Sequence, residues 1–316
     1  MTTPLPPTPY SLLPTPYSLP TNFQFSQGSL QDYVDCPRRF QLRYLQRLAW
    51  PAVEVEPALE NERHLQQGTA FHRLAHQHTL GIAPERLSSA VTDADLRRWW
   101  HNYLEHGPED LPESRYPEVV LSAPVGGYRL IAKYDLIAVG PSAMLRAGPS
   151  AILRAGPSAM PRAGAGKRAV IVDWKTSRKR PRRRWLAERL QTRVYPYLLV
   201  RAGGHLNDGQ ILEAEQVEMV YWFANFPEEP AHFVYDTAQY EADEAYLTSL
   251  VGQVANLSNS FYPLTTQKRH CKYCRYRSLC QRGVRAGALD EIEDELELDE
   301  GFDISLDFEQ IAEIEY

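Results

Sequence analysis

The sequence lacks the features that mark several common protein classes. No apolar run reaches the length of about 18 residues that a membrane-spanning helix requires, which excludes an integral membrane protein. The first residues show no basic region followed by an apolar stretch, so we expect no secretory signal. Four cysteines among 316 residues are too few for a disulfide scaffold. We therefore expect a protein of the reducing cytoplasm.

Positive charge is missing from the C-terminal end of the chain. Residues 290–316 contain thirteen Asp or Glu and no Lys or Arg. Without these thirteen negative charges, the net charge of −6 becomes +7 on residues 1–289, which suits a partner made of phosphates. The acidic tail then has three interpretations: it keeps the protein soluble, it covers the basic face, or it docks on a partner protein.

Low-complexity segments divide the chain. Residues 1–25 are Pro-rich and are expected to be a disordered extension. The octad Gly-Pro-Ser-Ala-Met-Leu-Arg-Ala begins at residue 140 and recurs twice with one substitution each, which indicates a loop insert over 140–166. We expect one domain over residues 26–285 that carries this insert, followed by the acidic tail over 286–316.

Two acidic residues adjoin apolar, β-branched runs. Asp135 lies in the run 130–137, and Asp173 ends the run 169–173 and is followed by Lys175 two positions later. Carboxylates are costly to bury unless they are paired or bind a metal. Two carboxylates can hold a hard divalent cation, and the cation and a lysine together offset charge that develops at a phosphate. This pattern points to a metal-dependent nuclease.

The spacing of the two acids predicts that they lie on neighbouring strands. They are 38 residues apart, of which the octads take 24, and the remaining 14 suffice for two antiparallel strands and a short turn. Elsewhere, periodicity predicts an α/β fold, with helices on both sides of a mixed sheet. The expected helices are 29–48 (broken near Pro37), 68–80, 93–106, 185–201 and 243–258, and the expected strands are 119–122, 128–139, 169–175, 216–226 and 232–235.

Further polar residues are candidates for the same site. His72 on the helix 68–80 is a plausible third metal ligand, although a helix histidine alone is more often an ordinary surface or core residue. Gln191 and Tyr195 are four apart on the helix 185–201 and share one face, where they could contact the scissile phosphate and stack on a nucleotide. As a pair they are equally compatible with an ordinary helix surface.

A run of cations follows Lys175. Its position favours a grip on a phosphate backbone, although a nuclear localisation signal or a solvated charge run would look similar. The six cations are Arg178, Lys179, Arg180, Arg182, Arg183 and Arg184.

The four cysteines form a second constellation. Cys271, Cys274 and Cys280 are closely spaced, and Cys36 lies far from them in the sequence. Thiolates at such spacing bind zinc or an iron–sulfur cluster, and spacing alone does not choose between the two. Such a site would join the two ends of the fold.

Taken together, these motifs resemble the PD-(D/E)XK nuclease superfamily, in its RecB-like branch with an iron–sulfur cluster, as in the AddB nuclease domain and the CRISPR-associated Cas exonucleases. The motifs that carry the resemblance are, in order, Ser29-Leu30-x4-Asp35-Cys36-Pro37-Arg38-Arg39-Phe40, Gly68-x3-His72, Asp135, Asp173-x-Lys175, Gln191-x3-Tyr195 and the cysteine triplet. The resemblance implies a restriction-endonuclease-like core whose ends are joined by a four-cysteine [4Fe–4S] cluster. It also implies Mg²⁺ or Mn²⁺ on His72, Asp135 and Asp173, with Lys175 as the catalytic lysine.

The resulting expectation is a DNA nuclease that degrades single strands or free ends in repair, recombination or CRISPR adaptation. No Gly-x4-Gly-Lys-Ser/Thr loop is present, so a helicase would be a separate partner. The alternative is a DNA-binding or assembly subunit that keeps the nuclease fold with little turnover. A zinc-stapled RNA-binding protein is a third interpretation, and it leaves Asp173 and Lys175 unexplained.

Overall fold

A computed structural model describes residues 19–48, 58–108, 110–141, 167–257, 262–271 and 274–283, with only the backbone described for 58–62. The expected Pro-rich extension, the octad insert and the acidic tail lie almost wholly outside the described residues. Within them, the expectation of an α/β fold is confirmed, and the strands form two sheets where one was expected.

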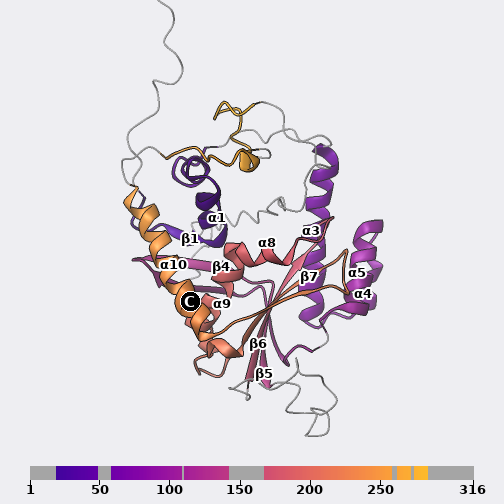
Figure 1. The fold of residues 1–316 in the computed structure, drawn as a ribbon. Coiled ribbons are helices and arrows are strands. Elements are labelled where there is room, and N and C mark those ends of the chain that lie inside the picture. The colour runs from indigo at the N-terminus through magenta and orange to yellow at the C-terminus, as the bar shows by residue number, and fades with distance from the viewer. Residues whose placement is uncertain are drawn as a thin grey trace, which may run out of the picture.

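The larger sheet has five strands in the order β2-β5-β6-β7-β8, and β6 and β7 are its only parallel pair (Figure 1). Strand β6 lies at the centre, and its residues from 169 to 174 are all buried, as expected of a strand covered on both faces. The strands are β2 (Ser114–Pro117), β5 (Leu136–Pro141), β6 (Lys167–Lys175), β7 (Val217–Phe223) and β8 (Ala231–Val234).

The smaller sheet has the order β1-β4-β3, with β1 parallel and β3 antiparallel to β4. The chain passes from this sheet to the larger one at Tyr134 and Asp135, between β4 and β5. The strands are β1 (Gln24–Ser26), β3 (Val120–Val125) and β4 (Tyr128–Lys133).

Helices cover both faces of the five-stranded sheet. Because successive strand residues point to opposite faces, Val170, Val172 and Trp222 pack against α3 and α5, while Ile171 and Met219 pack in the cluster with α9 and α10. The helices are α1 (Gln27–Asp35), α2 (Pro37–Phe40), η2 (Gln41–Leu45), α3 (Ala58–Thr79), α4 (Pro84–Ser89), α5 (Ala94–His106), α8 (Arg183–Glu188), α9 (Leu190–Ala202), η4 (Gly203–Leu206), η5 (Ala214–Gln216), α10 (Thr237–Asn256) and η6 (Lys268–Cys271).

Three expected elements are interrupted in the structure, and the sequence predicts only one of these breaks, the one near Pro37 in the helix 29–48. The expected strand 128–139 is wrong, because Tyr134 is fully buried and its hydroxyl donates to the Tyr195 carbonyl, which separates β4 from β5. The expected helix 29–48 is interrupted at Cys36, whose backbone is extended. The expected helix 185–201 is interrupted at Arg189, whose backbone is also extended, and α9 therefore has an N-terminus of its own.

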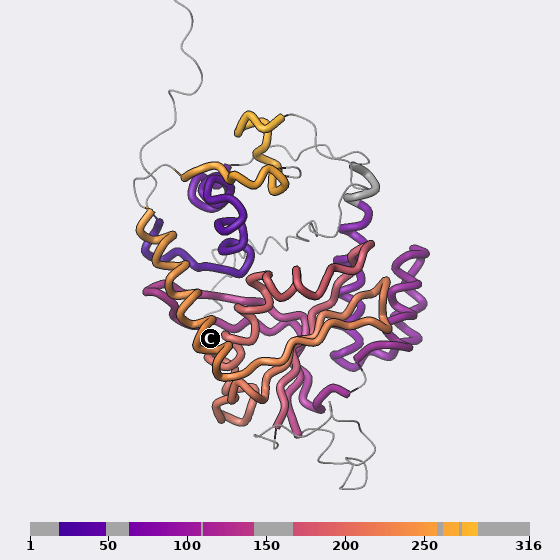
Figure 2. Tube along the Cα trace, viewed as in Figure 1, coloured from indigo at the N-terminus to yellow at the C-terminus, as the bar shows by residue number. Residues whose placement is uncertain are grey.

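The two ends of the described chain lie side by side. Figure 2 shows residues 19–48 in indigo beside the segment 262–283 in orange and yellow. The Arg38 N–H donates to the Pro263 carbonyl at 3.2 Å, and the Tyr276 hydroxyl donates to the Leu48 carbonyl at 3.1 Å. In the described part of the chain, none of the helices combines the length and the apolar character needed to cross a membrane.

Candidate active site

The hairpin of β5 and β6 brings Asp135 and Asp173 together. The two strands pair antiparallel with Leu136 opposite Val172, so the residues one step further, Asp135 and Asp173, lie at the same end of the pair. The Trp174 N–H donates to Asp135 Oδ2 at 2.9 Å, which joins the two acidic segments directly. The expectation that these two acids come from adjacent antiparallel strands is confirmed.

His72 reaches this pair from helix α3. Its Nδ1 lies 3.2 Å from Asp135 Oδ1, and the His72 side chain is about 10% exposed. The neighbouring Phe71 is fully buried in the cluster of α3, α5 and the sheet, and this packing fixes the helix against the strands. The structure thus places His72 beside the carboxylates, as the sequence predicts.

Lys175 and Gln191 converge on Asp173. The Lys175 Nζ lies 3.1 Å from Asp173 Oδ2, and Gln191 Nε2 donates to Asp173 Oδ1 at 2.6 Å. Asp173 and Lys175 are two apart on β6 and so project from the same face, toward α9. Lys175 also lies over the ring of Tyr221 at 5.8 Å. One carboxylate therefore faces an ammonium and an amide at the same time.

The electrostatics of the two acids differ. Burial raises the pKa of Asp173 to about 7; the nearby Asp135 also raises it, while Lys175 lowers it. Burial acts on Asp135 in the same direction, but the charge and hydrogen bond of His72 and the Trp174 N–H hold the pKa of Asp135 below its usual value. The ionised form is thus disfavoured at Asp173, mainly by burial, and stabilised at Asp135.

Tyr195 lies behind these groups, on the same face of α9 as Gln191. It is 7% exposed, and its ring packs on Tyr134 with 4.7 Å between centroids. Burial and the charges of Asp173 and Asp135 raise the pKa of Tyr195, whose hydroxyl hydrogen-bonds with Gln191. The structure therefore gives this ring a packing contact and its hydroxyl a contact with Gln191.

A family model of the PD-(D/E)XK nuclease superfamily matches residues 24–144 and 162–281. This chain belongs to the PD-(D/E)XK nuclease superfamily. The match contains every active-site candidate named above and all four cysteines, and it leaves out residues 145–161, which lie within the octad repeats. Mixed sheets flanked by helices fit the restriction-endonuclease-like core expected of this superfamily. No curated protein matches the chain.

Gln31 supports the nuclease site and was missed in the sequence. It is 7% exposed on α1, and its Oε1 accepts from the Leu190 N–H at 3.1 Å, at the N-terminus of α9. Its Nε2 donates to Asp35 Oδ1 at 2.9 Å. The side chain of Arg189, the N-cap residue, makes no capping hydrogen bond to α9. Gln31 therefore accepts a hydrogen bond from the helix N-terminus in its place, from a distant element. The only signal was its place inside the Ser29–Phe40 motif.

The basic run lies directly beyond β6 in this nuclease domain. Five of its six cations are exposed, and the sixth, Arg180, is partly buried. Arg180 donates to the Glu229 carbonyl at 3.0 Å, and Arg183 lies over the ring of Phe233 at 4.3 Å. Part of the run is therefore fixed against the connection between β7 and β8 and against β8. The exposed cations are Arg178, Lys179, Arg182, Arg183 and Arg184.

The four cysteines are divided between the two chain ends that pack together: Cys36 follows α1, and Cys271, Cys274 and Cys280 lie near the other end of the described chain. All four are free thiols, and Cys36 is buried. Burial raises the pKa of Cys271, Cys274 and Cys280, and the neighbouring thiols raise it further, so the four sulfurs lie within electrostatic reach of one another. Among the described residues, no three His, Cys, Asp or Glu side chains are gathered as closely as a bound metal ion requires. Both metal sites stay predictions.

Proposed function

We propose that this protein is a metal-dependent deoxyribonuclease that hydrolyses phosphodiester bonds at Asp135, Asp173 and Lys175. The observation that carries the proposal is the convergence of a lysine and a glutamine on Asp173 beside a second carboxylate. A structural ion pair would need neither the second buried acid nor the glutamine. The membership of a nuclease superfamily supports the same conclusion.

The chemistry of the residues present suits a divalent cation. Two carboxylates and an imidazole form the donor set, and oxygen ligands with one imidazole suit Mg²⁺ or Mn²⁺. Burial, and to a smaller extent the charge of Asp135, raises the pKa of Asp173, and a bound cation would offset both effects. His72, Asp135 and Asp173 would hold it. When bound, such an ion supplies charge stabilisation at the phosphate and a more acidic water.

The chain's own groups have separate tasks in this proposal. Lys175 offsets charge that develops on the phosphate and orients the attacking water, because its ammonium lies beside Asp173. Gln191 fixes the orientation of Asp173 through its 2.6 Å hydrogen bond and offers contacts to the scissile phosphate. His72 and the Trp174 N–H keep Asp135 ionised and in place.

We assign the grip on DNA to the basic run 178–184. Exposed cations that follow the catalytic lysine within a few residues are well placed to neutralise phosphates next to the cleavage point. We further propose action on single strands or free ends, in repair, recombination or CRISPR adaptation, with any helicase as a separate protein. Free thiols suit the reducing cytoplasm.

A [4Fe–4S] cluster on Cys36, Cys271, Cys274 and Cys280 is the proposed structural cofactor, and zinc is the alternative. Four free thiols within electrostatic reach of one another are a suitable donor set. Deprotonation by the bound metal would reverse the upward shift that burial imposes on the thiol pKa values. A brown protein that absorbs near 400 nm would identify iron.

The alternative function is a DNA-binding or assembly subunit that keeps this fold without turnover. The contacts that favour the enzyme are those of Asp173 with Lys175 and Gln191, because a subunit that only binds DNA has no need of them.

The deciding experiment uses anaerobically purified protein and end-labelled single- and double-stranded DNA. Wild type and Asp173→Ala are incubated with Mg²⁺, Mn²⁺ or EDTA. The proposal predicts degradation by wild type with Mg²⁺ or Mn²⁺ and none by the variant or in EDTA, and the label position gives the polarity. DNA binding without cleavage by wild type would instead favour the non-catalytic subunit.

A further inference from the structure

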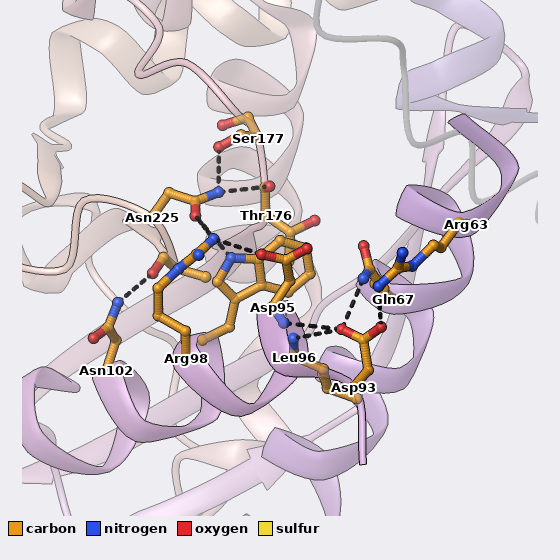
Figure 3. Close-up of polar contacts among 12 residues, drawn as sticks. Arg63, Gln67, Asp93, Asp95, Leu96, Arg98, Asn102, Thr176, Ser177 and Asn225 are labelled. Atoms are coloured by element: carbon orange, nitrogen blue, oxygen red, sulfur yellow. Dashed lines mark hydrogen bonds and ion pairs between the residues drawn. The ribbon is translucent and has the colours of Figure 1, made fainter. Parts of the chain in front are cut away.

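Asn225 joins helix α5 to the chain that leaves the catalytic strand. It lies two residues beyond the end of β7, and all polar atoms of its side chain are used (Figure 3). Its Nδ2 donates to the Thr176 carbonyl at 3.2 Å and to the Ser177 carbonyl at 2.9 Å. Its Oδ1 accepts from Trp99 Nε1 at 2.8 Å and from Arg98 at 3.1 Å.

These contacts fix three consecutive carbonyls at the end of β6. The Ala224 N–H donates to the Lys175 carbonyl at 2.8 Å, and the Asn225 side chain donates to the next two carbonyls, those of Thr176 and Ser177. A chain that leaves a strand normally gives up its ladder bonds within a residue or two. Here an amide side chain continues them, so the direction in which residues 176 and 177 leave Lys175 is set by Asn225.

The anchor for this direction is a rigid element. Trp99 is 1% exposed in the cluster between α5 and the sheet, so its indole N–H occupies a fixed position. Arg98 is held in addition by Asp95, at 3.1 Å on the same helix. A second side chain of this helix, Asn102, donates to the Ala224 carbonyl at 2.9 Å. Helix α5 thus holds the turn 224–225 at two points.

The basic run begins immediately after the clamped residues. Arg178 follows Ser177, and Arg180 is fixed by the Glu229 carbonyl and lies over the ring of Phe223 at 5.8 Å. The stretch between Lys175 and Arg180 is therefore held at both ends. An unclamped loop would present its cations over a wide range of positions and would lose binding energy in ordering them.

We infer that Asn225 is a positioning residue for the nucleic-acid substrate: it aligns the basic run 178–184 with Lys175, so that the phosphate backbone held by the run passes over the catalytic carboxylates. This inference rests on the proposed function, since it assigns the run to DNA. Asn225 itself touches no reacting group and acts through the backbone of Thr176 and Ser177.

Three variants separate the parts of the clamp. Asn225→Asp keeps an oxygen for Trp99 and Arg98 but replaces the donor by a carboxylate oxygen that faces two carbonyls. Trp99→Phe removes the indole donor and leaves the amide donors of Asn225 in place. Asn102→Ala is the matched control, because it removes a hydrogen bond from the same helix to the same turn without touching Thr176 or Ser177. Thermal unfolding shows whether each variant folds.

The first readout is binding of a fluorescein-labelled single-stranded oligonucleotide in EDTA, over a range of salt concentrations. Asn225→Asp should weaken binding about fivefold or more and give a shallower salt dependence, because fewer phosphates are neutralised. Asn102→Ala should stay within about twofold of wild type, since it leaves every contact of Asn225 in place. Trp99→Phe should lose less than Asn225→Asp, because Arg98 still donates to Asn225 Oδ1 and both amide donors remain. The second readout is cleavage, in which Asn225→Asp should raise KM and leave kcat nearly unchanged.

Equal binding by Asn225→Asp and wild type would overturn the inference, as would equal losses in Asn225→Asp and Trp99→Phe, which would indicate a merely structural role. A fall in kcat with unchanged binding would also contradict it. The binding readout does not need turnover: if wild type binds DNA without cleaving it, the proposed nuclease fails while Asn225 is still tested. If wild type binds no DNA, both fail.

Discussion

The proposed catalytic centre lies at the end of a strand pair in the interior of a five-stranded sheet. The cysteine-rich segment 262–283, in contrast, lies against the N-terminal helices through a few separate contacts. Around Asp173, ladder bonds to β5 and β7 and two layers of buried side chains fix the backbone. Around the cysteines, single hydrogen bonds such as Arg38 to Pro263 and Tyr276 to Leu48 join the two ends.

This difference separates the site that depends on the packing of the fold alone from the site that depends on a bound metal. The carboxylate centre is preorganised by packing, so polar substitutions there should change chemistry and leave stability nearly intact. The cysteine end has few buried apolar residues of its own, Tyr262 and Tyr276 among them, and should depend on its metal. The predictions below sharpen this contrast.

The largest effect is expected for Lys175→Met. Methionine keeps the apolar stem and removes the charge beside Asp173, so turnover should fall roughly 10²–10³-fold, with little change in unfolding temperature. Single-turnover cleavage and thermal unfolding check both parts. The matched control is Lys167→Met, at the other end of the same strand, where the ammonium pairs with Asp208. A similar loss in the control would contradict the assignment.

Cys280→Ser should instead change the local stability of the cysteine end. Loss of one thiolate should abolish metal binding at the cysteine end and open the segment 262–283 to proteases, while the sheet keeps its far-UV circular dichroism. Metal analysis and limited proteolysis of the purified variant measure this. Retention of full metal content with unchanged protease resistance would contradict a four-cysteine site.

Gln31 connects the two regions, and its replacement should affect both. Gln31→Leu leaves the Leu190 N–H and Asp35 without this partner, which should cost about 1–2 kcal/mol of unfolding free energy. It should also lower kcat, because Gln191 follows Leu190 at the start of α9. Denaturant unfolding and kinetics measure the two effects. Gln253→Leu, on the exposed side of α10, is the control and should change neither.

The smallest effect is expected at Asp93, away from both regions. The Leu96 N–H above all, with Arg63 and Gln67, lowers the pKa of Asp93 to about 2. A lowered pKa in the fold means that this contribution to stability is complete above about pH 4 and is lost as the pH falls toward 2. Asp93→Ala should cost about 1 kcal/mol at neutral pH through the lost N-cap of α5. Asp93→Asn keeps the N-cap, and its unfolding free energy should fall less than that of wild type as the pH drops from about 4 toward 2. An equal fall in the two proteins would contradict this.

The sequence was sufficient for the centre of the site and insufficient for its supports. Asp135 and Asp173 could be placed together because their spacing, without the octads, suits two consecutive antiparallel strands joined by a short turn. The break at Tyr134 could not be foreseen, since the apolar pattern continues through it and the deciding contact is with Tyr195, far along the chain. Gln31 and Asn225 were missed for the same reason. Each acts through hydrogen bonds to backbone groups far along the chain, and such contacts produce no periodic pattern in the sequence.

In the proposed function, the carboxylates beside Lys175 form the metal-binding centre that cleaves DNA. The most direct test measures Mn²⁺ binding by electron paramagnetic resonance and DNA cleavage in one preparation each of wild type and Asp135→Asn. Asparagine keeps the shape and an acceptor for the Trp174 N–H. Wild type should bind Mn²⁺ and cleave DNA, and the variant should lose both properties together. Manganese-dependent cleavage that persists in the variant would contradict it.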